Sequence, residues 1–360
     1  MAAFQTKQKF IFTVKPCAGF RVEHIGKVYP SRPHTGYKGS AILIRTEIAV
    51  FHAVLDFDAC INDGNTDGNT ADQYRQPPCD AVYSNQINRF RRKIMVGENN
   101  KVVIATGGSS GIGRCTASAL KENGCIVYEF SRRNIPMEGV THLSVDVTDE
   151  DAVHAAVPQV VQKETKIDAV INCAGFGISG AVEFTSMEQA KAQFDVNFFG
   201  TVTVNKAVLP FLRRQGKGHI VNISSVAAVA HIPFQAFYSA SKAAVSSYSY
   251  ALANEVKPYG IHVTVVELGD ICTGFTKARQ KSILGDDEYG GRISRSVSQM
   301  EHDEQNGMDP ARIGRYIAGI VEKKKPAIVY VAGAQYKFLS LLCKLLPAAA
   351  RGKIVGKIYG

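Results

Sequence analysis

The 360-residue sequence predicts an α/β fold built on a doubly wound parallel sheet of about seven strands. Three observations predict it. Short apolar runs, such as residues 102–105 and 169–171, are typical of strands buried on both faces of a sheet. From residue 101 onward these runs alternate with segments of helical periodicity. A glycine-rich turn, residues 106–113, joins the first run to the first helical segment.

The bulk composition is that of an ordinary globular protein, with 45% hydrophobic and 21% charged residues. The net charge of +10 divides equally between residues 1–94 and the rest, and no basic helix interleaved with aromatics occurs, so we expect no nucleic-acid partner. Eight cysteines without metal-ligand spacing predict reduced thiols, no metal site and a cytoplasmic location. The sequence has no eighteen-residue apolar run, and no adequate apolar region follows the basic N-terminal residues, so we expect no secretory signal.

Residues 1–94 are a poorly patterned N-terminal extension. Short apolar runs surround a polar, turn-rich stretch at residues 62–70 that has no periodicity. A small domain, a disordered extension and a start-site artefact are all open. Arg91-Arg92-Lys93 can be encoded by purine-rich codons like those of a bacterial ribosome-binding site, so we hypothesise that translation naturally begins at Met95. An intact mass that includes residues 1–94 would contradict this hypothesis.

The glycine-rich turn opens the first strand–helix unit, with the helical pattern starting at Arg114. Small residues let a pyrophosphate approach the backbone, and the helix end supplies free N–H groups and a positive dipole. The spacing is G-x-x-x-G-x-G, without the Gly-Lys-Ser/Thr ending of a triphosphate-binding loop. The predicted cofactor contacts of this turn are Gly107, Ser109, Ser110, Gly111, Ile112 and Gly113.

The second strand, residues 126–130, ends in Ser131-Arg132-Arg133, and this ending predicts the cofactor. A carboxylate here suits the ribose of NAD(H), whereas the guanidinium groups of Arg132 and Arg133 suit a 2′-phosphate. Glu129 lies one residue too early in the strand and should point elsewhere. We therefore predict a preference for NADP(H) over NAD(H).

The next two strands supply further predicted cofactor contacts. The third, which starts at Leu143, places Asp146 to reach the adenine, with Val147 beside it, and its connection from the second strand is too short for a helix. A helix over residues 151–164 leads to the fourth strand, residues 169–171. Small residues after this strand let the sheet edge pass close to the cofactor, and the predicted contacts there are Asn172, Ala174 and Gly175.

A Tyr-x-x-x-Lys pair is the centre of the predicted chemistry. If Tyr238 opens a helix, Lys242 lies four residues on and on the same face. A nearby cation favours the phenolate and lowers the pKa of a tyrosine from its ordinary value of about 10, which permits proton exchange near neutral pH. Ser225, after the fifth strand at residues 219–223, could hydrogen-bond the same substrate oxygen. Asn197 lies in a helix predicted over residues 187–212.

The sixth strand, residues 262–267, leads into a stretch whose predicted cofactor contacts are Gly269, Ile271 and Thr273. Residues 274–309 are polar and show no sustained pattern, which predicts a lid or a disordered loop over the carboxyl ends of the strands. A helix over residues 311–322 and a final strand, residues 327–331, complete the sheet.

The C-terminal tail, residues 335–360, is more apolar than a free tail should be and carries Arg351, Lys353 and Lys357. Three interpretations are open: a helix packed on its own domain, a subunit interface, or a peripheral membrane contact. We expect a homodimer or a homotetramer.

Five elements occur in a familiar order and at familiar intervals: Thr106–Gly113, Asn172–Gly175, Asn197, Ser225 and Tyr238–Lys242. On these the chain resembles the classical short-chain dehydrogenase/reductase family over residues 101–333. The resemblance implies a Rossmann-fold NADP-binding catalytic domain at residues 95–334. It also implies that Tyr238 is the general acid/base, that Lys242 lowers its pKa and binds the nicotinamide ribose, and that Ser225 positions the carbonyl or hydroxyl. Asn197 would support a proton-relay water.

Two positions depart from the family pattern: Leu268 stands where a proline is usual and Cys173 where a second asparagine is frequent. The short connection before the third strand, residues 176–178 and the apolar stretch 226–232 are similar to the 17-beta-hydroxysteroid and retinol dehydrogenase-like branch. This similarity implies a small-molecule ketone or secondary alcohol that is bulky and apolar, such as a steroid, retinoid or lipid. A 3-oxoacyl-thioester reductase and a catalytically silent NADP(H)-sensing regulator are the alternatives.

Overall fold

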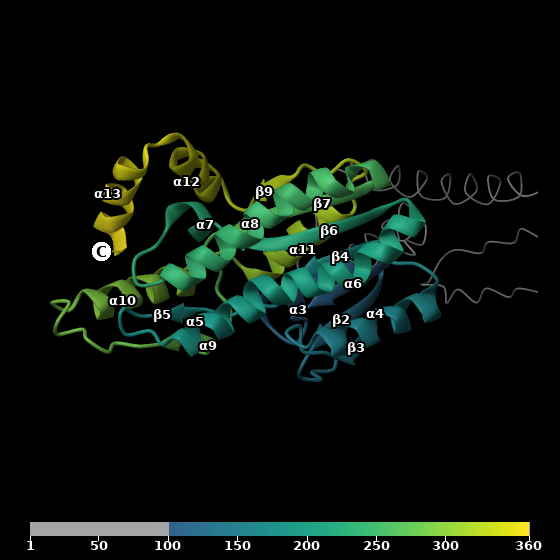
Figure 1. Ribbon diagram of the computed structural model, residues 1–360, viewed down its shortest axis with the longest axis horizontal. Helices are drawn as coiled ribbons and strands as arrows, with labels where there is room; N and C mark the ends of the chain where they lie inside the picture. Colours follow the sequence, from purple (N-terminus) through teal and green to yellow (C-terminus); the bar gives the residue numbers. More distant parts are fainter. Residues whose placement is uncertain (1–100, 360) are drawn as a thin grey trace, which may run out of the picture. The chain divides into compact units, whose positions relative to one another are not determined.

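The structure, a computed structural model, describes residues 101–359, so the predictions about residues 1–94 and Met95 lie outside the described residues. The described residues form a seven-stranded sheet with helices on both faces (Figure 1). All its neighbouring strands are parallel, in the order β3-β2-β1-β4-β6-β7-β9. This arrangement confirms the predicted fold class. The strands are β1 (Val102–Thr106), β2 (Ile126–Ser131), β3 (Val140–Ser144), β4 (Ala169–Asn172), β6 (Gly218–Ser225), β7 (Ile261–Leu268) and β9 (Val329–Val331).

Two apolar cores hold helices against the two faces of the sheet. Along β1, Val102 and Ile104 belong to one core and Val103 to the other, as the two-residue alternation of a strand requires. The first core contains residues of α4 (Glu150–Glu164), α6 (Gly200–Gln215) and α8 (Ala236–Val256). The second contains residues of α3 (Gly111–Glu122) and α11 (Pro310–Val321). A sheet buried on both faces explains why its strands are continuous apolar runs.

The strand order reverses direction next to β1, which pairs with β2 on one side and with β4 on the other. In sheets of this kind the connections before and after the reversal leave on opposite faces, and a crevice opens at the carboxyl ends of the strands. The glycine-rich turn after β1 and the residues after β4 therefore meet at one place.

The helix predicted over residues 187–212 is interrupted. It consists of α5 (Met187–Phe194), a single π-helical turn η1 (Asp195–Phe199), and α6. Such turns insert one residue into the helical hydrogen-bond ladder and are frequent at functional sites. Asn197 lies inside η1 and is fully buried. Hydrophobic periodicity could not reveal the interruption, because the apolar pattern continues through it.

The prediction of a lid or a disordered loop over residues 274–309 is wrong in part, because this segment contains regular structure. It forms α9 (Phe275–Ala278), β8 (Gln280–Lys281), which pairs with β5 (Ile178–Ser179), and α10 (Arg292–Gln305). Three widely spaced apolar residues of α10, Ile293, Val297 and Met300, pack with Phe234 in a small separate core. So few apolar residues in a polar segment give a weak helical signal, and the partner that completes the core is distant in sequence.

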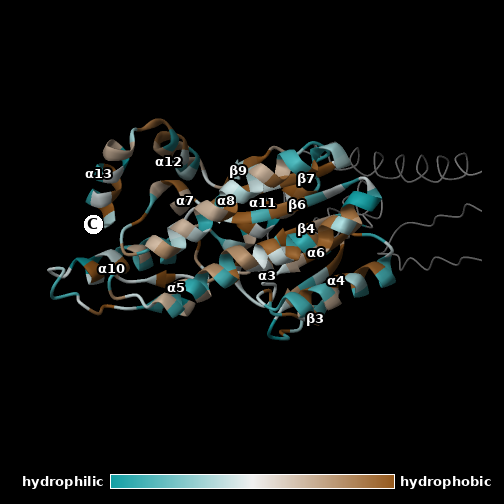
Figure 2. Cartoon of the chain, in the orientation of Figure 1, coloured by the Kyte–Doolittle hydropathy of each residue, from teal (hydrophilic) through white to brown (hydrophobic). Residues whose placement is uncertain are grey.

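The C-terminal tail forms two helices, α12 (Ala334–Leu345) and α13 (Ala348–Tyr359). Their inward side chains pack with those of α7 (Ala227–Ala230) in a fourth core. Of the three interpretations of the C-terminal tail, packing on its own domain therefore describes the inward faces of α12 and α13. Figure 2 shows that hydrophobic residues colour the strands of the sheet and also parts of α12 and the turn toward α13. Among residues 101–359, no helix is both long enough and apolar enough to span a bilayer.

Candidate active site

A cavity of about 900 Å³ lies at the carboxyl ends of the strands. Its wall includes the glycine-rich turn, the ends of β2, β4, β6 and β7, and side chains of α8, α12 and α13. We call the part lined by Gly107, Gly113, Arg132, Arg133 and Asp146 the cofactor end. The part lined by Phe275, Glu304, Tyr336, Leu339 and Ile358 is called the substrate end.

The glycine-rich turn forms a cradle that side chains would fill. Gly107 and Gly111 have φ angles of +69° and +54°, a left-handed conformation that favours glycine. A Cβ atom on Gly113 would lie 2.4 Å from the carbonyl oxygen of Gly107, so only glycine allows α3 to start this close to β1. The Oγ1 atom of Thr106 accepts hydrogen bonds from the backbone N–H groups of Cys173 (3.1 Å) and Ala174 (3.0 Å), which ties β1 to the end of β4.

Two cationic side chains line the cofactor end just after β2. Arg132 and Arg133 are exposed and line the cavity, and Arg132 Nη1 lies 3.8 Å from Asp146 Oδ2. Glu129 is buried and points elsewhere, as expected from its place in the strand: it accepts a hydrogen bond from Ser131 Oγ and contacts the ring of His142. The end of β2 therefore presents guanidinium groups to the cavity, while its carboxylate is held inside the fold.

The structure brings the predicted cofactor contacts to one cavity wall, with one exception. Those on the wall are Gly107, Ser109, Ser110, Gly111, Ile112, Gly113, Arg132, Arg133, Asp146, Val147, Ala174, Gly175, Tyr238, Lys242, Gly269, Ile271 and Thr273. The exception is Asn172, whose buried amide donates hydrogen bonds of 2.8 Å to Asn205 Oδ1 and Asn222 Oδ1. The side chain of Asn172 therefore faces the interior and does not line the cavity, and its predicted cofactor contact stays a prediction.

Tyr238 and Lys242 both line the cavity from α8, with Lys242 Nζ 5.9 Å from the centre of the Tyr238 ring. Ser225, the last residue of β6, hydrogen-bonds the phenol of Tyr238. Two contacts between Ser224 and α8 keep these elements in register: Ser224 Oγ donates to the carbonyl oxygen of Lys242 (3.0 Å) and lies 2.8 Å from Ser246 Oγ. A proton donor, a second hydroxyl and a cation thus meet at one position on the wall.

The pKa of Tyr238 is shifted in the direction opposite to the sequence expectation. Burial raises it to about 12, because a phenolate would lose its hydration, and this outweighs the lowering by the hydrogen bond with Ser225. Burial also lowers the pKa of Lys242 to about 8. The ammonium donates a hydrogen bond to the carbonyl oxygen of Ile223 (3.0 Å). At neutral pH Tyr238 is therefore protonated, which is the state a proton donor to a ketone requires.

Asn197 positions the site from behind the wall. Its Oδ1 accepts from the N–H of Phe176 (3.0 Å), and its Nδ2 donates to the carbonyl oxygen of Phe176 (3.0 Å) and to Ser241 Oγ (3.1 Å). Asn197 does not line the cavity, but a Cβ atom on neighbouring Gly175 would lie 3.0 Å from its Oδ1 and 3.6 Å from Lys242 Nζ. It therefore joins the segment after β4 to α8, next to Lys242.

Sequence reasoning missed the residues of the substrate end. The ring of Phe275 lies 5.8 Å from that of Tyr238. The hydroxyl of Tyr336 donates to Asp270 Oδ2 (2.8 Å), and its ring packs so closely on Gly269 that a Cβ atom there would lie 2.3 Å away. The apolar pattern of the C-terminal tail indicated that the tail contacts another surface, but it did not identify that surface as the cavity wall.

A dinucleotide fits this arrangement, because the glycine cradle admits phosphates and Arg132 and Arg133 provide positive charge at the far side. When bound, a nicotinamide cofactor would supply the hydride for a carbonyl carbon. The chain's own residues can donate a proton to the carbonyl oxygen from Tyr238 and hold that oxygen through Ser225. Within residues 101–359, no three or more His, Cys, Asp and Glu side chains form a group suited to a metal ion.

Comparisons with known proteins agree with this chemistry. The family model described as short chain dehydrogenase matches residues 101–283. A 3-ketodihydrosphingosine reductase of Bacteroides thetaiotaomicron is 44% identical over 229 residues, which are 63% of this chain and 85% of that protein. A probable short-chain type dehydrogenase/reductase of Helicobacter pylori, VdlC, is 31% identical over 254 residues, 69% of this chain and 94% of that protein. A short-chain dehydrogenase structure from Streptomyces avermitilis matches with a TM-score of 0.64 and 28% identity, covering 72% of this chain and 98% of that one.

Proposed function

Because this chain belongs to the short-chain dehydrogenase family, we propose that it transfers hydride between NADP(H) and a long-chain, lipid-like ketone or secondary alcohol. The observation that carries the proposal is the single cavity that joins the glycine cradle, Arg132 and Arg133 to the cluster of Tyr238, Lys242 and Ser225. A carbonyl can receive a hydride from the cofactor and a proton from Tyr238 only if the cofactor site and the proton donor open into the same cavity.

In the proposed reduction, Tyr238 donates its proton to the carbonyl oxygen while Ser225 hydrogen-bonds the same oxygen. The raised pKa of Tyr238 favours this direction, because the phenol carries its proton at neutral pH. Lys242 stabilises the resulting phenolate with its positive charge, and Asn197 holds the neighbouring backbone in place. In the reverse direction, the same phenolate would accept the proton of an alcohol.

The preference for NADP(H) is proposed from the charges at the end of β2. A 2′-phosphate can take forked, charge-assisted hydrogen bonds from Arg132 and Arg133. Glu129, the carboxylate of this strand, is engaged with Ser131 and His142 inside the fold and does not line the cavity. No carboxylate of β2 therefore lines the cavity where the phosphate would lie.

The substrate class is proposed from the substrate end and from the relative that is named for 3-ketodihydrosphingosine. Apolar side chains of three helices and of the segment after α7 line this end: Phe275, Leu339, Ile354, Ile358 and Ile232. An alkyl chain placed there would be removed from water, at a gain of roughly 0.8 kcal/mol for each buried CH₂ group. A long-chain ketone uses this surface better than a small polar one.

A carboxylate at the same end supports an amino ketone within that class. Asp270 and Glu304 both line the cavity, and the charge of each raises the pKa of Tyr238, whereas the charge of Arg279 lowers it. Glu304 is engaged with Arg279 and Thr276. Asp270 accepts from the neutral hydroxyl of Tyr336. An ammonium group beside the carbonyl, as in 3-ketodihydrosphingosine, would be stabilised by Asp270.

A substrate panel tests the proposal. The purified full chain is assayed at the nicotinamide absorbance band, with NADPH and with NADH, on 3-ketodihydrosphingosine, a steroid ketone, retinal and a 3-oxoacyl thioester. We expect the highest kcat/KM for the long-chain amino ketone with NADPH. Fastest turnover of the thioester would replace the proposal by a fatty-acyl reductase. Tight cofactor binding without turnover of any carbonyl would replace it by a regulatory sensor.

Assembly and location belong to the same proposal. We propose a homodimer or a homotetramer in the cytoplasm, the location that the eight cysteines without metal-ligand spacing favour. Light scattering on the purified chain measures the first, and fractionation of the source cells measures the second. A monomer at micromolar concentration would contradict the assembly.

A further inference from the structure

The outward face of α12 is apolar although it lies at the surface. Phe338, Leu341 and Leu345 are 68%, 57% and 75% exposed. Their spacing of three and four residues places them on one side of the helix. The opposite side, with Tyr336, Leu339 and Cys343, packs into the core shared with α7. A surface helix normally presents polar residues outward, so this outer stripe marks a contact with something apolar.

The same two helices carry positive charge only. Residues 334–359 contain five Lys and Arg and no Asp or Glu. Lys344 is paired with buried Glu267 (2.8 Å), and Arg351 donates to the carbonyl oxygen of Cys343 (3.1 Å). Lys337 of α12 and Lys353 and Lys357 of α13 are exposed, so cations accompany the exposed apolar side chains of both helices.

This charge pattern selects among the candidate partners. A twofold dimer formed through the C-terminal helices would place the patch against its own copy, so cations would face cations. Anionic lipid headgroups are complementary, because each basic side chain near such a surface is attracted while the apolar side chains enter the headgroup and acyl boundary. An apolar stripe bordered by lysines fits a lipid surface better than a second copy of this chain.

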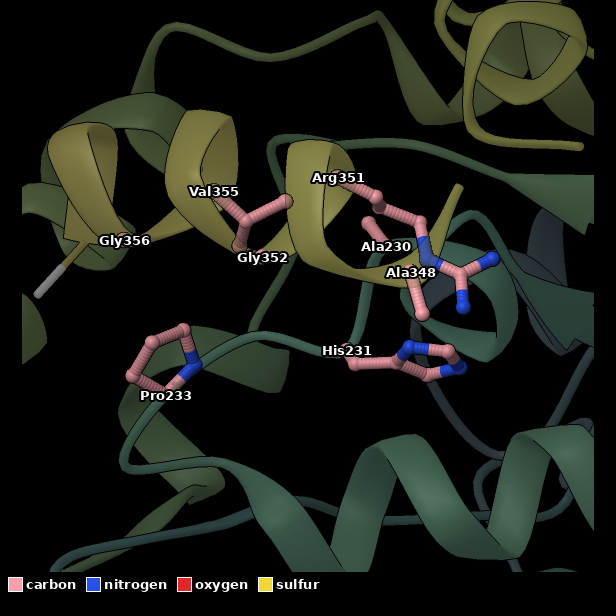
Figure 3. A pocket seen from close by; sticks show the side chains of 8 residues that line it. All are labelled: Ala230, His231, Pro233, Ala348, Arg351, Gly352, Val355 and Gly356. Carbon is pink, nitrogen blue, oxygen red and sulfur yellow. The ribbon is translucent and has the colours of Figure 1, made fainter. Parts of the chain in front are cut away.

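The cavity is open to solvent beside α13. Ile354 and Ile358 of α13 line the cavity and are 40% and 51% exposed, so this helix forms an accessible part of the wall. On another side α13 faces the segment after α7, and Figure 3 shows Arg351 and Val355 of α13 with His231 and Pro233 of that segment around the gap between them. A void of about 270 Å³ lies between them. Val355 is buried in the fourth core and the hydroxyl of Tyr359 donates to Asp303 Oδ2 (3.0 Å), so α13 is anchored beside this void while Ile354 and Ile358 remain accessible.

A buried ion pair fixes α12 relative to the catalytic centre. Glu267, at 0% exposure, accepts from Lys344 Nζ (2.8 and 3.0 Å) and from Ser340 Oγ (2.6 Å). Glu267 belongs to β7, two residues before Gly269, whose surface the ring of Tyr336 covers. The outer stripe of α12 therefore keeps a defined orientation toward the cavity.

We propose that α12 and α13 dock on an anionic lipid membrane and that the long-chain substrate enters the cavity directly from the bilayer past α13. The proposal rests on the proposed function in that it takes the substrate to be a lipid-like ketone. Docking through Phe338, Leu341 and Leu345 places the exposed side chains of α13 near the headgroups, so an alkyl chain passes from lipid to Ile354 and Ile358 without crossing bulk water.

Vesicle flotation tests the docking. The full chain is mixed with vesicles of phosphatidylcholine alone or with phosphatidylglycerol added, and we expect it to float with the anionic vesicles and to be released by high salt. The triple substitution Phe338→Ser, Leu341→Ser, Leu345→Ser should lower the partition coefficient by about tenfold or more. Met187→Ser and Phe199→Ser alter exposed apolar residues at 60% and 54% exposure elsewhere and should leave it unchanged.

Further measurements distinguish a failure of the membrane proposal from a failure of the proposed function. The wild-type chain staying in the soluble fraction with anionic vesicles overturns the proposal. So does a triple variant that changes only the oligomeric state in light scattering, since the stripe would then be a subunit interface. Turnover of a soluble short-chain ketone should persist in the triple variant, while turnover of the long-chain ketone in vesicles falls. Absence of turnover on every carbonyl would refute the proposed function and leave the flotation result standing.

Discussion

The cofactor end and the substrate end of the cavity are built in different ways. The cofactor end comes from short segments at the ends of strands, where Gly107, Gly111 and Gly113 make a cradle that backbone geometry fixes. The substrate end comes from side chains of α10, α12 and α13, which meet only through packing between distant parts of the chain. One end is therefore specified by local sequence, and the other by tertiary contacts.

This difference separates chemistry from specificity. Hydride transfer needs a fixed cradle and a proton donor, which short motifs on rigid strands and helices can supply. Recognition of an alkyl chain needs a broad apolar wall, which many side chains can share without a motif. The predictions below alter one end and ask whether the other is unaffected.

The largest effect is expected where the two ends meet. Tyr238→Phe removes the proton donor and keeps the ring that contacts Phe275, so kcat should fall by about 10²- to 10⁴-fold. NADPH affinity, measured by quenching or enhancement of cofactor fluorescence, should change little, because the cradle is untouched. Tyr316→Phe, at a tyrosine on the opposite face of the sheet, is the matched control. Unchanged turnover in the Tyr238 variant would exclude it as the acid.

The cofactor end alone is altered by Arg132→Ala together with Arg133→Ala. We expect the Kd for NADPH to rise by about tenfold to a hundredfold, because two charge-assisted contacts with a phosphate are lost. The Kd for NADH should rise much less, and KM for the ketone should not change. Arg214→Ala, an exposed arginine near the end of α6, is the control. Equal losses for both cofactors would contradict the phosphate assignment.

The same division explains what the sequence could predict. The parallel sheet of about seven strands and the cofactor end follow from buried apolar runs and from the positions of Gly107, Gly113 and Arg132. These are local signals that act wherever the chain folds into parallel strands. The pattern could not specify side-chain direction within the interior: Asn172 lies at the predicted strand end, yet its amide turns toward Asn205 and Asn222.

The substrate end could not be predicted for a related reason. The helix α10 has only a few apolar residues in a polar segment, and their partner Phe234 is distant in sequence. The pKa of Tyr238 was also predicted in the wrong direction, because the sequence shows the neighbouring Lys242 but not the burial that outweighs it. Desolvation depends on the whole surrounding fold, whereas spacing along a helix does not.

The pH dependence of the reduction rate tests Lys242 and Tyr238, which lie where the cofactor end and the substrate end meet. Lys242, with its pKa lowered to about 8 by burial, carries a positive charge below that pH and loses it above, while Tyr238 keeps its proton up to about 12. The rate of ketone reduction should therefore be flat below about pH 8 and fall by about tenfold per pH unit above it. In Lys242→Arg the guanidinium stays charged, so a slower enzyme without this inflection is expected. An inflection that persists in the arginine variant would assign it to another group.

The smallest effect is expected from Asp270→Asn, which alters only the charge at the substrate end. The amide keeps an acceptor for the hydroxyl of Tyr336, so the packing of α12 on Gly269 should be preserved. Loss of one partly screened charge should raise KM for a long-chain amino ketone by about fivefold, because such a pair contributes about 1 kcal/mol or less.

A neutral ketone of equal chain length distinguishes this reading of Asp270 from a loss of packing. Its KM should be the same in Asp270→Asn and in the wild-type chain, since it has no ammonium to lose a partner. Asp303→Asn removes a nearby carboxylate that accepts from Tyr359 and does not line the cavity, so it should affect neither substrate. If both ketones lose affinity equally, Asp270 acts through the position of Tyr336, and the substrate end recognises the alkyl chain alone.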